Sequence, residues 1–538
     1  MQSLSIHRLR ALWLPLLLLF ALNSGCADSN QRAANLAAQA QSQLQAGDLE
    51  NARSSIGQAI ATRDDVADYY VLLGRVELQA ERPTSAFNAY SLALDLQADN
   101  PEVLQAIAEL GLQTGRLHEA DEAADRMLLL MPNAVQAMLV KGFIAIDDGR
   151  IPDAWKMAND ILALNPNDEG GIILSARLRA LEGQQDEALS ILDAASGEVR
   201  DTNAMNLTRL EIYRLQGDAA RMKEILPRIL KNMTGDSDYT LDYVNLLYKT
   251  GEAVKARQES VKAIEGAPKD LELLSKLSDL WVEHDRLPLS NAQIRFFAES
   301  GTRGQQLVLA RFFFESGELA KARQLLSRLS DQRVLEAQAL MARINLAEGD
   351  KVAAYRQASA ILLADPRNGD ALLVNAARNL AEGKIDRAIE DLNIVVADSP
   401  QNLDGYIALA NAYSAKGTEI RARQTFERGM DTLPQSLRLA EAFRAYLLKT
   451  GDKNRIVSLE QDVAVAKPSS VRAWSIYAQT CRQLGDALCS ARADAGLTVA
   501  KRSYLVDDPP GTPRRRGLFA RITPEKICAS TGGICTGA

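Results

Sequence analysis

Aromatic residues and histidine are both scarce in this sequence. Phe, Trp and Tyr together make up 5% of its 538 residues, and it contains three histidines. Carbohydrate sites usually stack sugar rings on exposed aromatic side chains, so this composition does not favour them. Histidine is the most common general acid–base group and metal ligand, and only His118 and His284 lie beyond residue 26. The composition leaves little material for a sugar site or a histidine-based catalytic site.

The sequence also lacks the short motifs by which many enzymes are recognised. None of G-x-G-x-x-G, G-x-x-x-x-G-K-[ST], G-x-S-x-G and H-E-x-x-H occurs in it. The formal net charge of −7 argues against a general nucleic-acid binder, which needs a basic surface. We therefore expect no enzyme, no catalytic, cofactor-binding or metal-binding residues, and no nucleic-acid partner.

Long apolar runs are missing beyond residue 26, where no run approaches the ~18 residues that a membrane-spanning helix needs. Before it, His7, Arg8 and Arg10 precede the apolar run ALWLPLLLLFAL (residues 11–22), and small and polar residues follow. This pattern is typical of a signal peptide, here residues 1–26, so we expect the chain to be exported.

The residues after the apolar run, LNSGC, resemble the lipobox of bacterial lipoproteins. In that motif small residues such as Ser24 and Gly25 precede the cysteine that receives the lipid, here Cys26. The motif usually has Leu three residues before the cysteine, where this sequence has Asn23. The alternative is ordinary signal cleavage after Ala27, which would leave a soluble periplasmic or secreted protein. In bacterial lipoproteins, an Asp directly after the lipid-bearing cysteine usually retains the protein in the inner membrane. Here Ala27 follows Cys26, so a lipid on Cys26 would favour anchoring to the outer membrane, facing the periplasm.

A 34-residue spacing runs through most of the chain. It is marked by turn residues at Gly47, Glu81, Gly115, Gly149, Gly183, Gly217, Gly251, Asp285, Gly317, Gly349, Gly383, Gly417, Gly451 and Gly485. The steps from Asp285 to Gly317 and from Gly317 to Gly349 are 32 residues, and the others are 34. Gly permits the left-handed turn that ends a helix. An alanine five residues later allows two helices to approach closely, and a proline 17 residues later often ends the second helix. Each unit therefore predicts a pair of antiparallel helices.

These positions resemble the tetratricopeptide-repeat (TPR) signature over about residues 33–500. The resemblance implies an all-α fold, a TPR solenoid of about 14 helix–turn–helix repeats in a right-handed superhelix whose first helices line a concave face. We expect a block of about eight repeats in residues 27–300 and one of about six in residues 301–500. The short steps predict irregular stacking within residues 285–350. The close-packing alanine is replaced at four positions, Met222, Ser290, Ile456 and Ser490.

Long solenoids of this family usually bind proteins or peptides in the concave groove, which the ninth residue of each first helix normally faces. From these positions and one neighbouring aromatic residue, the groove candidates are Arg75, Phe143, Arg177, Asn245, Arg311, Phe314, Arg343 and Asn411. Arg311, Arg343 and Phe314 would form a cationic and aromatic patch able to hold a carboxylate. The alternative is that these are ordinary solvated residues and that Phe314 belongs mainly to the core.

Residues 501–538 lack the repeat and are expected to form a flexible tail. Its basic cluster, Arg514–Arg516 with Arg521, either contacts anionic lipid or an acidic partner, or is simply a solvated run of charge. Besides Cys26, four cysteines lie near the end of the chain: Cys481, Cys489, Cys528 and Cys535.

An even number of cysteines in an exported protein favours disulfides. The first choice pairs Cys481 with Cys489 and Cys528 with Cys535, and the alternative is a cross-pairing that ties the tail to the last hairpin. A four-cysteine zinc site is less favoured, because neither pair has the usual C-x₂₋₄-C spacing.

The lipobox-like start and the long repeat array together resemble bacterial TPR lipoproteins that accompany envelope assembly or exopolysaccharide export, including those linked to the PEP-CTERM sorting system. The resemblance implies a non-enzymatic protein–protein interaction scaffold in the cell envelope, with a lipid anchor, protein or peptide partners in the groove, and no cofactor. The alternative is direct binding of an extracellular polymer, polysaccharide or peptidoglycan, along the groove.

Overall fold

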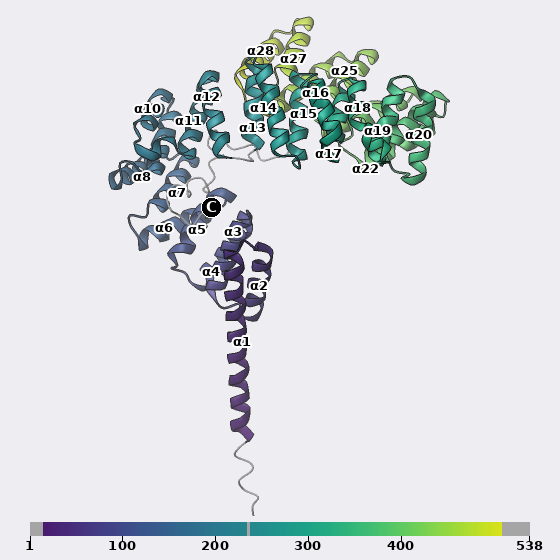
Figure 1. Ribbon diagram of the computed structural model, residues 1–538. Helices are drawn as coiled ribbons and strands as arrows, with labels where there is room; N and C mark the ends of the chain where they lie inside the picture. Colours follow the sequence, from purple (N-terminus) through teal and green to yellow (C-terminus); the bar gives the residue numbers. More distant parts are fainter. Residues whose placement is uncertain (1–13, 234–236, 508–538) are drawn as a thin grey trace, which may run out of the picture. The chain divides into compact units, whose positions relative to one another are not determined.

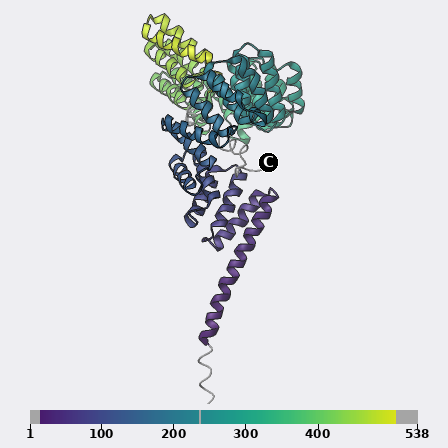
Figure 2. The same ribbon diagram turned by 90° about the vertical axis from the view of Figure 1, so that its left-hand side faces the viewer.

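The computed structural model describes residues 14–233 and 237–507, and these residues are mostly helical (Figure 1). They form 28 α-helices and one short 3-10 helix (η1), with no β-strand. Most successive helices within each unit pack against one another as antiparallel pairs, such as α1 with α2 and α21 with α22 (Figures 1 and 2). The prediction of an all-α helical repeat solenoid is therefore confirmed.

Packing divides the chain into two compact units, which meet in the sequence between Gln216 and Gly217. The described part of the N-terminal unit, residues 14–216, comprises α1 (Leu14–Gln45), α2 (Leu49–Thr62), α3 (Ala67–Gln79), α4 (Pro83–Leu96), α5 (Pro101–Thr114), α6 (Leu117–Leu130), α7 (Val135–Asp147), α8 (Ile151–Leu164), α9 (Glu169–Leu181), α10 (Gln185–Ala194), η1 (Gly197–Asp201) and α11 (Asn203–Gln216).

The described part of the C-terminal unit runs from residue 217 to residue 507, apart from residues 234–236. It comprises α12 (Ala219–Asn232), α13 (Ser237–Lys249), α14 (Ala253–Gly266), α15 (Leu271–His284), α16 (Asn291–Ser300), α17 (Arg303–Glu315), α18 (Leu319–Asp331), α19 (Leu335–Ala347), α20 (Lys351–Ala364), α21 (Gly369–Ala381), α22 (Ile385–Asp398), α23 (Leu403–Ala415), α24 (Glu419–Thr432), α25 (Leu437–Thr450), α26 (Lys453–Ala466), α27 (Val471–Leu484) and α28 (Ala487–Arg502).

The turn between the helices of a pair depends on a left-handed backbone. The twelve glycines at the turn position all have positive φ, from 68° at Gly217 to 92° at Gly349. A Cβ atom at Gly383 would meet no atom within 4 Å, so the requirement there is conformational and not one of space. Glu81 takes the same left-handed conformation, with φ of 56°, and is a strained exception.

The close-packing alanine lies where the two helices of a pair meet. All ten alanines at this position are fully buried, with 0% exposure: Ala52, Ala86, Ala120, Ala154, Ala188, Ala256, Ala322, Ala354, Ala388 and Ala422. Because protein interiors are close-packed, a larger side chain at these positions would push the helices apart. Close contact also explains Gly74, where an added Cβ would lie 2.7 Å from the ring of Tyr90.

The regular hairpin is interrupted after α15. Asp285, at the turn position, has φ of −156°, which is extended backbone, and residues 285–290 form a non-helical connection. Ser290, which replaces the close-packing alanine, instead caps the short helix α16 in a capping box with Gln293. Packing nevertheless continues through this region, since α17 lies on α15 and α18 on α16. The shortened repeats therefore mark an irregular connection, while the units divide earlier, at residue 216.

The remaining predictions from the sequence concern the two ends of the described chain. Helix α1 begins at Leu14, within the apolar run, and continues without a break past position 26. No helix of the described residues is long and apolar enough to cross a membrane. Near the other end, a disulfide joins Cys481 on α27 to Cys489 on α28, with 5.4 Å between their Cα atoms. Cys528 and Cys535, which are predicted to pair with each other, lie outside the described residues, as does most of the expected tail.

Candidate functional site

The groove candidates of the N-terminal unit are engaged in contacts within the chain. Arg75 on α3 donates a hydrogen bond to Glu102 on α5, with 2.8 Å between Nε and Oε1. Arg177 on α9 is 2% exposed and lies 3.5 Å from Glu211 on α11. Its guanidinium lies over the ring of Phe143, 5.3 Å from the ring centroid. The arginines therefore link neighbouring repeats through their first helices.

The N-terminal unit also has an open cavity of about 1030 Å³ at the N-terminal ends of α7 and α9, bordered by the connections that precede these helices and by η1. Polar side chains in its lining include those of Gln105, Asn133, Gln136, Asn167, Glu169 and Thr202. Amide side chains can both donate to and accept from a peptide backbone. Asn167 is already bonded through both amide atoms to the backbone of Ser196, and Gln105 donates to Glu109. The amides of Asn133 and Gln136 are the lining groups from which a bound peptide backbone could take hydrogen bonds.

The two asparagine candidates of the C-terminal unit differ in their surroundings. Asn411 on α23 is exposed. Asn245 on α13 is 2% exposed, and its amide donates to the carbonyl oxygens of Tyr504 and Leu505 at 3.1 and 3.2 Å. The same position in the repeat is therefore open in one place and covered by the chain itself in the other.

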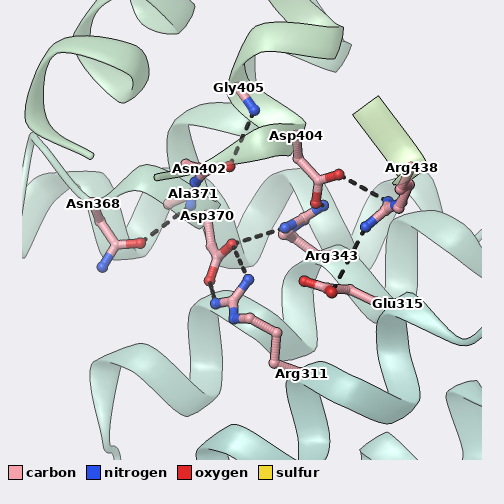
Figure 3. A network of polar contacts seen from close by, with 10 residues as sticks. All are labelled: Arg311, Glu315, Arg343, Asn368, Asp370, Ala371, Asn402, Asp404, Gly405 and Arg438. Carbon is pink, nitrogen blue, oxygen red and sulfur yellow. Dashed lines mark hydrogen bonds and ion pairs between the residues drawn. The ribbon is translucent and has the colours of Figure 1, made fainter. Parts of the chain in front are cut away.

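Arg311 and Arg343 do lie together, as the sequence suggested, and Figure 3 shows their partners. Arg311 on α17 donates to Asp370 on α21 at 2.5 and 3.3 Å. Arg343 on α19 donates to Asp370 at 3.0 Å and to Asp404 on α23 at 2.5 Å. The guanidinium of Arg343 also lies 4.6 Å from the ring centroid of Phe314. Carboxylates of the chain itself thus occupy the cationic and aromatic patch.

Two more charged residues complete this cluster. Arg438 on α25 lies 2.8 Å from Asp404 and 3.9 Å from Glu315 on α17. The six residues of the inner charge network are Arg311, Glu315, Arg343, Asp370, Asp404 and Arg438. Three arginines balance three acids, so the cluster has no net charge when all six are ionised. It connects the first helices of five successive repeats.

Burial and charge act against each other on the acids of the network. Burial alone would raise the pKa of Asp370, but the charges of Arg311 and Arg343, with their hydrogen bonds, outweigh it and leave that pKa below 3.8. Glu315 shows the reverse balance: burial and the nearby Asp404 raise its pKa above 4.5 in spite of Arg438. Asp370 is therefore held in its ionised form more firmly than Glu315.

Helix caps position the two aspartates. Asn368 accepts a hydrogen bond from the backbone N–H of Ala371, at 3.2 Å, and so caps α21 two residues before Asp370. Asn402 caps α23 in the same way through Gly405, at 3.0 Å. An acid in the first turn also interacts favourably with the helix dipole. The pattern Asn-x-Asp thus places a carboxylate at the start of α21 and of α23.

The candidates from the sequence do not include Glu315, Asp370, Asp404 and Arg438. Those candidates occupy the ninth residue of a first helix, whereas Asp370, Asp404 and Arg438 occupy the second. The caps were a usable signal, because NGD at residue 368, NLD at 402 and SLR at 436 recur 34 residues apart. Among the residues that the structure describes, no group of three or more His, Cys, Asp or Glu side chains could hold a metal ion.

Comparison with known proteins gives one family match. Residues 37–101 match the family profile described as tetratricopeptide repeat. No curated protein matches the sequence.

Several solved structures are similar to parts of this chain. A tetratricopeptide repeat protein from Parabacteroides merdae is 19% identical, covers 47% of this chain and 99% of its own, and has a TM-score of 0.39. Pseudomonas aeruginosa pilF is 18% identical over 39% of this chain and 95% of its own, with a TM-score of 0.29. YrrB, described as a TPR protein with an unusual peptide-binding site, is 17% identical over 32% of this chain and 89% of its own, with a TM-score of 0.29. These similarities are too low to carry an argument about function.

Proposed function

Because the chain is a tetratricopeptide-repeat protein, we propose that it is a non-enzymatic scaffold of the bacterial cell envelope that binds partner proteins or peptides along its first helices. The observation that carries this proposal is the open cavity at the N-terminal ends of α7 and α9, whose lining includes the amide side chains of Asn133 and Gln136. In the C-terminal unit, the groove candidates Arg311 and Arg343 are already paired with carboxylates of the chain. The first site for a partner is therefore the N-terminal unit.

Site-specific crosslinking in living cells tests this proposal. A photoreactive amino acid at Gln105 or Gln136, both in the cavity lining, is expected to capture a defined protein from the envelope. The matched control is the same group at Glu122, an exposed position on the second helix α6, which should capture little. Equal capture from both faces, or no protein captured from the cavity, would contradict the proposal.

The alternative function, binding of an extracellular polymer, is an outcome of the same experiment. Recovery of glycan with no repeatable protein partner would replace the scaffold by a polymer-binding protein. The scarcity of aromatic residues favours protein partners. Envelope assembly and exopolysaccharide export are the processes in which we propose to look for the partner.

The location belongs to the proposal as well. We place the protein at the outer membrane, facing the periplasm, with a lipid on Cys26. Labelling with radioactive palmitate should mark the native protein and fail to mark a Cys26→Ser variant. Unchanged labelling of the variant would refute Cys26 as the lipid acceptor and would leave ordinary cleavage after Ala27.

A further inference from the structure

A short non-helical segment after α28 lies against α13, more than 250 residues earlier in the chain and within the same unit. We call Ser503–Asp507 the closing segment. Asn245, in the middle of α13, holds it by donating to the carbonyl oxygens of Tyr504 and Leu505. These contacts go to main-chain atoms, so they do not depend on the side chains of the closing segment.

Two further side chains of α13 contact the backbone of the closing segment. Lys249 donates to the carbonyl oxygen of Ser503 at 2.6 Å, and Asp242 accepts from the backbone N–H of Val506 at 3.2 Å. Asp242, Asn245 and Lys249 are spaced i, i+3 and i+7, so they lie on one face of the helix. Together they engage donors and acceptors of four successive residues, 503–506, as a peptide-binding surface does.

The side chains of α13 that contact the closing segment are buried, and other side chains hold them in place. Asn245 and Asp242 are 2% and 3% exposed. The oxygen of the Asn245 side chain lies 3.1 Å from Nε2 of His284 on α15, which fixes the orientation of the amide. The His284 ring in turn stacks on Tyr248, with 5.3 Å between ring centroids and 7° between the planes. The amide is therefore preorganised toward the closing segment.

The acidic end of the closing segment is held separately. Asp507 accepts hydrogen bonds from the backbone N–H and the hydroxyl of Ser469, at 3.0 and 2.8 Å. Next to it, Glu283 on α15 accepts a hydrogen bond from Ser470 at 2.6 Å and lies 3.3 Å from Lys467. The residues between α26 and α27 and those after α28 thus close onto α13 and α15.

We propose that the closing segment is an internal ligand in a peptide site on α13, and that the site binds an extended peptide of another protein when the segment leaves. The contacts define the partner: main-chain donors and acceptors over four residues, followed by an acidic residue. This inference rests on the proposed function and names a second, regulated site for it. A tethered segment competes at an effective concentration of about 1 mM, so the site is closed to weak partners until the segment is displaced.

A fluorescein-labelled peptide with the sequence of residues 501–507, KRSYLVD, tests the inference. The mature protein truncated after Arg502 should bind this peptide at least ~10-fold more tightly than the intact protein, because only part of the intact population has a free site. In the truncated protein, Asn245→Ala should weaken binding about 10-fold. Asn411→Ala is the matched control and should leave binding unchanged, since Asn411 has the same repeat position but is exposed.

Equal binding by the intact and truncated proteins, or an equal effect of the two asparagine variants, would overturn the inference and leave the closing segment a structural clip. If truncation unfolds the protein, Val506→Pro in the intact chain replaces it. Proline removes the N–H that donates to Asp242, fixes φ at this position and replaces the half-buried Val506 side chain, so the closing segment should bind less well and peptide binding should rise above that of the native protein. No rise with Val506→Pro would likewise overturn the inference.

The two proposals fail separately. Capture of a partner at Gln136 together with no peptide binding at α13 would reject the internal ligand and leave the scaffold intact. Peptide binding by the truncated protein without any captured envelope protein would reject the scaffold and leave the site on α13.

Discussion

Glu81 shows what the turn position demands of a residue. Its φ of 56° lies in the left-handed region, as does the φ of 72° at Gly383, but only glycine adopts it without strain. Glu81→Gly is therefore expected to stabilise the N-terminal unit by about 1 kcal/mol, and Gly383→Ala to destabilise the C-terminal unit by about as much. Urea unfolding of each variant measures the change. Shifts of the same sign in both variants would contradict the conformational explanation.

Asp370 matters because two arginines depend on it. Asp370→Asn is expected to lower the free energy of unfolding by about 3 kcal/mol, since Arg311 and Arg343 would lose a buried partner. The matched control is Asp398→Asn, which removes the partner of the exposed Arg367 and should cost much less.

The loss of stability caused by Asp370→Asn is expected to depend on pH. The folded pKa of Asp370 lies below its ordinary value of 3.8, so its contribution to stability is complete well above pH 3.8. That contribution is lost as the pH falls below 3.8 and through the lower folded pKa. The difference in unfolding free energy between native protein and Asp370→Asn should therefore shrink in acid. A constant difference from pH 7 to pH 3 would show that the ionised carboxylate is not what stabilises the network.

At the scale of the helix pair, the last hairpin carries a covalent link. The disulfide between Cys481 and Cys489 spans a sequence separation of 8 residues. Loop-closure entropy for so short a loop corresponds to about 2.5 kcal/mol. Dithiothreitol should therefore lower the unfolding midpoint of the C-terminal unit. The double variant Cys481→Ser/Cys489→Ser should start at the lower midpoint and respond little to reductant, and a further large drop would assign the effect to Cys528 and Cys535.

The helix pairs themselves could be predicted from the sequence because each depends on few residues. A glycine that must be left-handed and an alanine that must be small are local requirements, and they repeat at fixed spacing. The positions of Gly383 and Ala388 in the structure follow from this rule. Asp285 was the visible departure from it, and there the hairpin is lost.

Contacts between distant repeats could not be predicted in this way. Arg311 and Asp370 are 59 residues apart, and Asn245 lies about 260 residues from Leu505. Such pairs depend on how far the stack curves, which no single repeat encodes. The candidate list therefore included Arg311 and Asn245 but not their partners.

At the scale of the whole molecule, the two units are expected to respond independently. Ala388→Leu should destabilise the C-terminal unit by about 1–3 kcal/mol through overpacking, and Ala120→Leu should do the same to the N-terminal unit. Hydrogen exchange, read helix by helix, should show lost protection only in the unit that carries the substitution. The effects of the two substitutions should add within about 0.5 kcal/mol in the double variant, and strong coupling would contradict the division at residue 216.

The contact between the closing segment and α13 also changes where the C-terminal unit can begin to come apart. In an open array the outermost repeat has one neighbour, so fraying starts there. Here α28 and the closing segment have a second set of partners on α13, and the residues before α27 have a partner on α15, so we expect these contacts to oppose fraying at the C-terminal end. The connection at residues 285–290 lacks the hairpin turn. We therefore expect a pulling force from a bound partner to separate the helices of the C-terminal unit first at this connection.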